Sequence, residues 1–304
     1  MGLNTGIEWT NHTLNLVWGC VKVSPGCKFC YADVLDNIYN HGERHWGPGS
    51  TRKLVRSWKK KLNDMRKSAI ANNRRETVFV MSMGDIFEDD QPLSNNHDTP
   101  WKTLDDVRQE FFRMIPDYPE LIFLLLTKRP ENIRAILPQD IYSGEPGLAN
   151  KFRAYPHNVW FGTSVVNQDE VVPRLSALYG LGMWAKTFVS IEPLLGPVTL
   201  GEMIDATDWV IVGGESGQKA RPMHPDWVRS LRDETLAAEI PFFFKQWGEN
   251  FPIESEEVVA ESIGGNPIVK KTVKYEKIGK HNAGKTLDGV IIQQLPEEFH
   301  KPLK

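Results

Sequence analysis

The chain has 304 residues, of which 40% are hydrophobic and 25% are charged, and its formal net charge is −3. These values are typical of a folded globular protein and exclude a collagen, a coiled coil and a wholly disordered chain. Its three cysteines, Cys20, Cys27 and Cys30, all fall within eleven residues. An odd number of closely spaced cysteines argues against a disulfide framework, so we ask what three thiolates hold.

Short apolar runs alternate with longer amphipathic segments along most of the chain. The runs have the length of buried parallel strands, which we expect at Thr13–Trp18, Thr77–Met81, Leu121–Leu126, Asn158–Gly162, Thr187–Ile191, Trp209–Val212 and Phe242–Phe244. Helices are expected at Thr51–Asn72, Leu104–Ile115, Pro130–Leu137, Gln168–Tyr179 and Pro225–Glu239. Strand followed by helix, repeated about six times, predicts right-handed βαβ units.

This alternation predicts an α/β fold, with residues 1–250 forming a partial (β/α)6-type, TIM-like barrel and a doubly wound open sheet as the alternative. Residues 251–304 are expected to form a small β-rich C-terminal extension. We find no signal peptide and no run of the ~20 apolar residues that a membrane span requires. We therefore expect no membrane partner and a cytoplasmic location, where thiols stay reduced and free for metal.

Polar or glycine-rich residues follow most of the expected strands, which is where parallel α/β folds gather their chemistry. Their coincidence on one rim of the sheet predicts an active site. These residues are Ser82–Asp85 after the second strand, Lys128 and Arg129 after the third, Thr163 and Ser164 after the fourth, Glu192 after the fifth and Gly213–Glu215 after the sixth.

The cysteines are spaced Cys-x6-Cys-x2-Cys, and two kinds of metal site are compatible with this spacing. A structural zinc site needs four ligands, and His12, His41 and His45 are candidates for the fourth. An iron–sulfur cluster can instead take three thiolates and leave one iron open to a small-molecule cofactor. We favour the cluster, because the three clustered thiolates lack a clear fourth ligand.

The segment Cys27-Lys28-Phe29-Cys30, after the first strand of an α/β chain, resembles the radical S-adenosylmethionine superfamily, although the usual spacing there is Cys-x3-Cys-x2-Cys. The closer resemblance is to a phage and bacterial family with a three-cysteine motif. Eight segments carry it in chain order: Trp18–Cys20, Ser24–Ala32, Ser82–Phe87, Leu126–Asn132, Phe161–Val165, Ser190–Pro197, Gly213–Gly217 and Lys245–Gly248.

The resemblance implies a [4Fe–4S] cluster held by Cys20, Cys27 and Cys30, with S-adenosylmethionine on its open iron. Reduction by an external donor of the flavodoxin or ferredoxin type would yield a 5′-deoxyadenosyl radical that abstracts a hydrogen atom from substrate. The implied cofactor-binding residues are Phe29, Ser82, Gly84, Asp85, Thr163, Ser164, Glu192, Gly213 and Gly214. Lys128, Arg129, Glu215 and Lys245 remain for substrate charge or proton transfer.

Several of these residues also have a purely structural interpretation. Asp85 is compatible with a helix cap, Gly213-Gly214 with a turn and Phe29 with a core position.

Positive charge is segregated in the sequence. Residues Arg52–Arg75 contain ten Lys or Arg and one acid, Asp64, so this segment carries +9 and the rest of the chain −12. Such a basic stripe is typical of phosphate contacts, and Trp46 and Trp58 are placed to stack on bases; a solvated amphipathic helix is the alternative.

Together with the phage resemblance, the basic stripe predicts a modified base in DNA as substrate. The implied reaction is isomerisation of N-linked to C-linked glycyl-thymidine on a base flipped out of the duplex. Two hypotheses compete with it: a radical enzyme acting on a peptide or small metabolite, and a non-catalytic, zinc-stapled nucleic-acid-binding protein.

Overall fold

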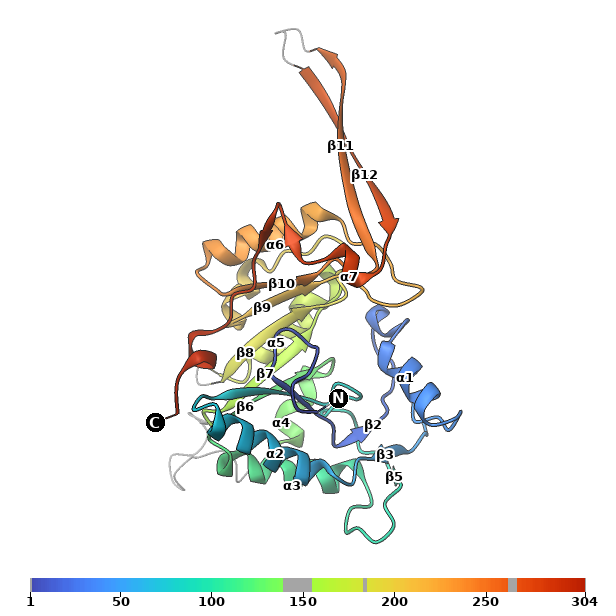
Figure 1. Ribbon diagram of the computed structural model, residues 1–304, viewed down its shortest axis with the longest axis vertical. Coiled ribbons are helices and arrows are strands. Elements are labelled where there is room, and N and C mark those ends of the chain that lie inside the picture. Colours follow the sequence, from blue (N-terminus) through green and yellow to red (C-terminus); the bar gives the residue numbers. More distant parts are fainter. Residues whose placement is uncertain (1, 139–154, 183–184, 262–266, 304) are drawn as a thin grey trace.

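The fold is built on one parallel sheet of seven strands, seen in the computed structural model, which describes residues 2–138, 155–182, 185–261 and 267–303 (Figure 1). The strand order β1-β4-β6-β7-β8-β9-β10 follows the chain without reversal. The strands are β1 (His12–Leu14), β4 (Glu76–Val80), β6 (Leu121–Thr127), β7 (Val159–Ser164), β8 (Lys186–Ile191), β9 (Val210–Gly213) and β10 (Phe242–Gln246).

Helices lie in most of the connections between these strands. Among the described residues, no helix is both long and apolar enough to span a membrane. The helices are α1 (Tyr31–Tyr39), α2 (Trp58–Ala71), α3 (Leu104–Met114), α4 (Ile133–Ile136), α5 (Val171–Tyr179), α6 (Pro225–Ala237) and α7 (Lys280–Ala283), with short 3-10 turns η1 (Pro25–Cys27), η2 (Ile115–Asp117), η3 (Pro130–Asn132), η5 (Gln168–Glu170), η6 (Gly201–Ala206) and η7 (Glu297–His300).

The α/β class is as expected, but the prediction of a partial (β/α)6-type, TIM-like barrel is wrong. The sheet has seven strands and stays open as a half-barrel. The connection from β8 to β9 contains only the 3-10 turn η6, because Pro193, Gly196 and Pro197 interrupt a helix there. The doubly wound alternative also fails, since right-handed crossovers in an unreversed strand order lie on one face of the sheet.

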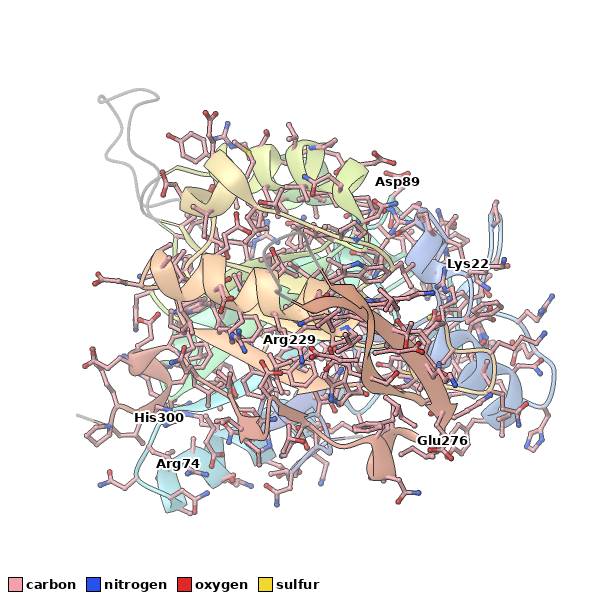
Figure 2. All side chains as sticks on the ribbon, turned by 90° about the horizontal axis from the view of Figure 1, so that it is seen from above. Lys22, Arg74, Asp89, Arg229, Glu276 and His300 are labelled. Carbon is pink, nitrogen blue, oxygen red and sulfur yellow. The ribbon has the colours of Figure 1, made fainter. Side chains whose placement is uncertain are left out.

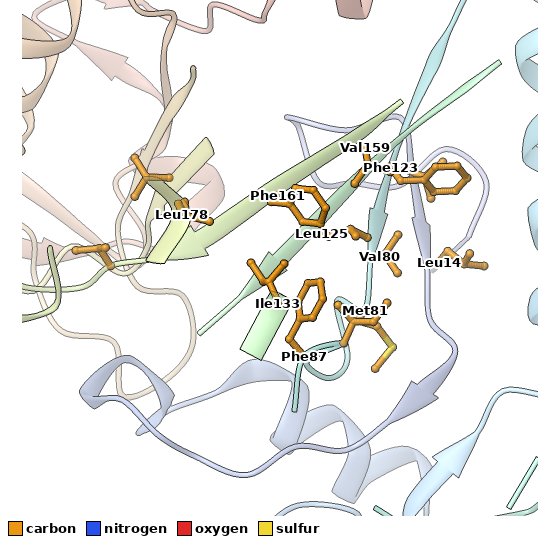
Figure 3. Close-up of a cluster of buried hydrophobic side chains, with 14 of the residues drawn as sticks. Leu14, Val80, Met81, Phe87, Phe123, Leu125, Ile133, Val159, Phe161 and Leu178 are labelled. Atoms are coloured by element: carbon orange, nitrogen blue, oxygen red, sulfur yellow. The ribbon is translucent and has the colours of Figure 1, made fainter. Parts of the chain in front are cut away.

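Both faces of the sheet are buried, and alternate residues of each strand point to opposite faces. On the helix side, Phe123 and Leu125 of β6 join a large core (Figure 3). On the other side, Leu124 joins a second cluster that contains Trp9 and Phe299, from the two ends of the chain. The termini, rather than helices, therefore fill the concave face of the half-barrel.

A small three-stranded sheet takes up the end of one expected strand and the start of one expected helix. Its strands are β2 (Val17–Trp18), β3 (Arg52–Leu54) and β5 (Leu93–Ser94). The expected strand Thr13–Trp18 divides into β1 and β2, and the expected helix Thr51–Asn72 begins only at Trp58 because residues 52–54 pair with β2 and β5.

After residue 250 the chain forms a long two-stranded arm that projects from the body (Figure 1). Its strands are β11 (Asn250–Glu261) and β12 (Pro267–Lys277), and the short pair β13 (Thr286–Leu287) and β14 (Val290–Ile291) follows. Arg229 of α6, labelled in Figure 2, binds both oxygens of Glu254 at 2.7 and 2.6 Å and also contacts Asp288 at 2.6 Å. These ion pairs anchor the base of the arm.

Gly162 offers a direct test of the sheet packing. A Cβ on Gly162 would lie 2.3 Å from the ring of Phe188 on the neighbouring strand β8. We expect Gly162→Ala to lower the free energy of unfolding by about 1–3 kcal/mol, measured by urea denaturation, because the ring has to shift. At Gly196 an added methyl meets nothing within 4 Å, so Gly196→Ala is the control. Equal urea midpoints for both variants would contradict this packing.

Candidate functional site

The three cysteines line one cavity of about 210 Å³, to which residues at the carboxyl ends of several central strands contribute. Polar residues that the sequence places after separate strands thus meet around one space. Of the expected site residues, the lining contains Cys20, Cys27, Cys30, Ser82, Gly84, Asp85, Lys128, Arg129, Ser164, Glu192 and Lys245.

Two glycines allow the cysteine segment to pack closely against the rest of the chain. Gly19 has a φ of +121°, and a Cβ there would lie 2.3 Å from the backbone oxygen of His45. A Cβ on Gly26 would lie 2.6 Å from Cγ1 of Val166. A side chain at either position would therefore push a cysteine away from the cavity.

Buried charged side chains hold the backbone directly after Cys20. The Val21 N–H donates to Oε1 of Glu88 at 2.7 Å, and Nη2 of Arg129 donates to the Val21 carbonyl oxygen at 2.8 Å. Arg52 donates to both oxygens of Glu88, at 2.8 and 2.7 Å. Because Arg52, Glu88 and Arg129 are all buried, this ionic network fixes the position of Cys20.

Asp85 orients Arg129. Its Oδ2 accepts hydrogen bonds from Nη1 of Arg129 and from the Lys128 N–H, both at 3.0 Å, and its Oδ1 accepts one from the Thr127 hydroxyl at 2.7 Å. The same Nη1 lies 3.8 Å from the sulfur of Cys20. The carboxylate thus directs a fixed positive charge at one cysteine.

The electrostatic surroundings of Cys20 favour the protonated thiol in the absence of metal. Burial raises the pKa of the Cys20 thiol well above its usual value, and the charges of Asp85 and Glu88 raise this pKa further. Arg129 opposes the shift through its charge and its hydrogen bond. Arg129 is therefore the side chain placed to stabilise the thiolate form of this cysteine, which is the form of a thiol that metals bind.

An ion pair joins two cavity residues, Glu192 directly after β8 and Lys245 of β10. Nζ of Lys245 is 2.8 Å from Oε1 of Glu192, and the Ser190 hydroxyl donates to Oε2 at 3.1 Å. A Cβ on Gly213 would lie 2.4 Å from Oε1 of Glu192. Gly213 therefore makes room for the Glu192 carboxylate.

The remaining expected site residues stand outside the lining that the described residues form. The Thr163 hydroxyl donates to the Thr127 carbonyl oxygen at 3.1 Å, inside the sheet. A Cβ on Gly214 would lie 1.9 Å from the Trp247 carbonyl oxygen, so backbone packing accounts for this glycine. Five expected residues form this group: Phe29, Thr163, Gly213, Gly214 and Glu215.

Arg221 links two of these outlying residues to the cysteine segment. It binds both carboxylate oxygens of Glu215, at 2.7 and 2.5 Å, and donates to the Pro25 carbonyl oxygen at 3.2 Å. Its guanidinium carbon also lies 5.3 Å from the ring centre of Phe29. Glu215 and Phe29 therefore hold Arg221 against the turn before Cys27.

Sequence patterns did not single out Arg52, Glu88, Arg221 or Tyr31 as parts of the site. Tyr31 lines the cavity, and its hydroxyl donates to the Ser82 carbonyl oxygen at 2.9 Å. Its position directly after Cys30 was the one available signal. The other three act through partners that are distant in the sequence, such as Glu88 for Arg52.

Two of the three candidate fourth zinc ligands, His12 and His45, have other partners. Nε2 of His12 lies 2.7 Å from Glu76, and its Nδ1 accepts the Asn4 N–H at 3.2 Å. Nδ1 of His45 lies 3.0 Å from Asp36. Within the described ranges, no three or more His, Cys, Asp or Glu side chains converge as ligands of one metal ion.

The comparisons with known proteins give one match. Residues 4–296 match the sequence model of a family described as protein of unknown function (DUF5131), and the chain belongs to this family. No curated protein and no solved structure matches the chain.

The buried network around Arg129 predicts a large loss of stability when its cation is removed. Arg129→Met leaves Asp85 and Glu88 buried without this partner, and we expect the free energy of unfolding in urea to fall by about 3–5 kcal/mol. Lys128→Met is the control, since Lys128 forms no ion pair among the described residues, and we expect a change within about 0.5 kcal/mol. A similar loss in both variants would refute the network.

Proposed function

We propose that this chain is a radical S-adenosylmethionine enzyme. The observation that carries the proposal is that Cys20, Cys27 and Cys30 line a single cavity at the carboxyl ends of a parallel sheet. The resemblance of the cysteine segment to the radical S-adenosylmethionine superfamily supports the same assignment. The chain would act as a catalyst that activates a C–H bond of its substrate.

The donor set fits an iron–sulfur cluster with one open iron. Three thiols face one space, and each thiolate of a [4Fe–4S] cluster binds a different iron, so the three need not converge on one point. The two cofactors, when bound, would supply a radical able to abstract hydrogen from carbon. Arg129, 3.8 Å from the Cys20 sulfur, would donate a hydrogen bond to that ligand, a contact that tunes cluster potential.

The cavity lining supports some of the cofactor contacts better than others. Ser82, Gly84 and Asp85 lie together after β4, where polar groups would bind the amino group of S-adenosylmethionine; Asp85 contributes mainly by holding Arg129. Ser164 and Glu192 line the cavity and would bind ribose hydroxyls. Four of the implied cofactor-binding residues lie outside this lining and would support the residues that touch the cofactor: Phe29, Thr163, Gly213 and Gly214.

Two lysines are available for substrate charge or proton transfer. Lys128 and Lys245 both line the cavity, and Lys245 is held by Glu192 at 2.8 Å. Glu215 is engaged by Arg221 and would act by positioning the cysteine turn. We assign the two lysines to the substrate side of the cavity.

The proposed substrate is a modified base in DNA, isomerised from N-linked to C-linked glycyl-thymidine. The basic stripe Arg52–Arg75 and the phage resemblance support this choice. A base flipped out of the helix could enter a cavity lined by strand ends. The single electron needed would come from an external donor of the flavodoxin or ferredoxin type.

Loading the chain with iron and sulfide under anaerobic conditions tests the cofactor assignment. We expect a brown protein with broad absorbance near ~400 nm and about four irons per chain. Cys20→Ala, Cys27→Ala and Cys30→Ala should each lose this absorbance, whereas Lys28→Ala, inside the same motif, should keep it. A colourless protein with stoichiometric zinc would overturn the assignment and favour the zinc-stapled alternative.

Product formation tests the substrate. With dithionite as reductant, we expect DNA that carries the N-linked glycyl base to increase the cleavage of S-adenosylmethionine to 5′-deoxyadenosine. Unmodified DNA of the same sequence is the control. Cleavage that is stimulated by peptides or small metabolites, and not by this DNA, would reject the DNA substrate and leave the radical class intact.

A further inference from the structure

A second hollow lies against the small sheet β2-β3-β5, outside the cysteine cavity. It has a volume of about 390 Å³, within the range of small-ligand sites. We call it the Trp18 groove, after the aromatic side chain at the end of β2. Trp18, Tyr39, Lys53, Arg56, Lys61 and Asn95 contribute to its lining.

The free positive charge of the basic stripe is concentrated in this groove. Most cations of the stripe form ion pairs: Arg52, Lys59, Lys60, Arg66, Lys67 and Arg74 pair with nearby carboxylates. Among the described residues, four cations of the stripe have no carboxylate partner: Lys53, Arg56, Lys61 and Arg75. The first three line the groove. Lys53 donates instead to the amide oxygen of Asn40, a neutral group.

An exposed aromatic ring stands beside these cations. Tyr39 is 62% exposed, and its ring lies 6.2 Å from that of Trp18 in an edge-on arrangement. Trp58, by contrast, which the sequence placed as a base-stacking residue, is fully buried in the core. Cations next to an exposed ring match the phosphates and bases of a single nucleic-acid strand. An acidic peptide would use the cations and leave the ring without a partner.

The groove adjoins the cysteine cavity. Trp18 lines the groove and Cys20, two residues later, lines the cavity. Tyr31 of the cavity and Tyr39 of the groove stand at opposite ends of α1, and the helical rise puts their Cα atoms roughly 12 Å apart. One short oligonucleotide can therefore contact both sites.

We propose that the Trp18 groove binds a single nucleic-acid strand next to the base that enters the cysteine cavity. Lys53, Arg56 and Lys61 contact its phosphates, and Tyr39 stacks on a base. The inference rests on the proposed function for the role of the bound strand, but the binding itself needs neither cluster nor S-adenosylmethionine.

The test is fluorescence anisotropy with a labelled oligothymidylate of about 12 nucleotides and the full chain, with and without iron and sulfide. We expect Lys53→Gln, Arg56→Gln and Lys61→Gln together to weaken Kd about tenfold or more. Three lost phosphate contacts should also reduce the slope of log Kd against log salt by about 2.

A triple variant in the same segment is the matched control. Lys60→Gln, Lys67→Gln and Arg74→Gln remove the same charge from ion-paired, exposed positions. Figure 2 shows Arg74 on the opposite side of the molecule from Lys22, which lines the cysteine cavity. We expect this control to change Kd by no more than about twofold.

Tyr39→Ala separates stacking from charge. We expect it to weaken Kd about fivefold or more while the salt slope stays unchanged, because a ring contributes no counterion release. Thermal melts by circular dichroism check that each variant is folded. A ribo-oligonucleotide of matching sequence distinguishes DNA from RNA, and binding of either supports the groove.

Three outcomes would overturn the groove: no oligonucleotide binding by the unmodified chain, equal losses in the two triple variants, or equally effective competition by polyglutamate. Oligonucleotide binding by a chain that takes up no iron when iron and sulfide are supplied would reject the proposed cofactor and keep the groove. A brown chain that binds no oligonucleotide would do the reverse, so the two failures are distinguishable.

Discussion

The candidate site depends on one buried guanidinium. Arg129 contacts the Asp85 carboxylate, the carbonyl oxygen after Cys20 and the Cys20 sulfur itself, and its partner Glu88 is shared with Arg52. Burying this many charges costs several kcal/mol per ion, which the pairing has to offset. An apolar core of the same size would avoid this desolvation cost. The arrangement makes sense where a sulfur has to be held in place, as a thiolate, against two nearby carboxylates.

The open half-barrel explains where this guanidinium can act. Since all seven central strands are parallel, their carboxyl ends face the same rim, and residues from Cys20 after β2 to Lys245 of β10 reach one cavity. Gly19, Gly26 and Gly213 then let the cysteine segment and Glu192 approach closer than a Cβ permits. In the basic stripe, ion pairs with nearby carboxylates engage most of the cations. Lys53, Arg56 and Lys61 have no such partner and lie beside Tyr39 in one groove.

Local sequence patterns predicted much of this fold and less of the site. The apolar runs marked the central strands, because each is buried on both faces and leaves a continuous signal. Closure of the sheet was beyond such patterns, because the same alternation of strands and helices is compatible with a partial barrel and with an open sheet. The sequence predicted Asp85 as a site residue. It predicted Arg129 only as a charge for the substrate or for proton transfer, and not as the partner of Asp85. The links from Arg221 to Glu215 and Phe29, and from Glu88 to Arg52, join residues whose proximity no spacing rule predicts.

We propose that the three cysteines hold an iron–sulfur cluster with one open iron. Electron paramagnetic resonance of the iron-loaded, dithionite-reduced chain, recorded before and after addition of S-adenosylmethionine, tests it most directly. We expect a signal of a reduced [4Fe–4S] cluster that changes when S-adenosylmethionine is added, because the cofactor would bind the open iron. A chain that takes up no iron, or a cluster signal that S-adenosylmethionine leaves unchanged, would contradict it.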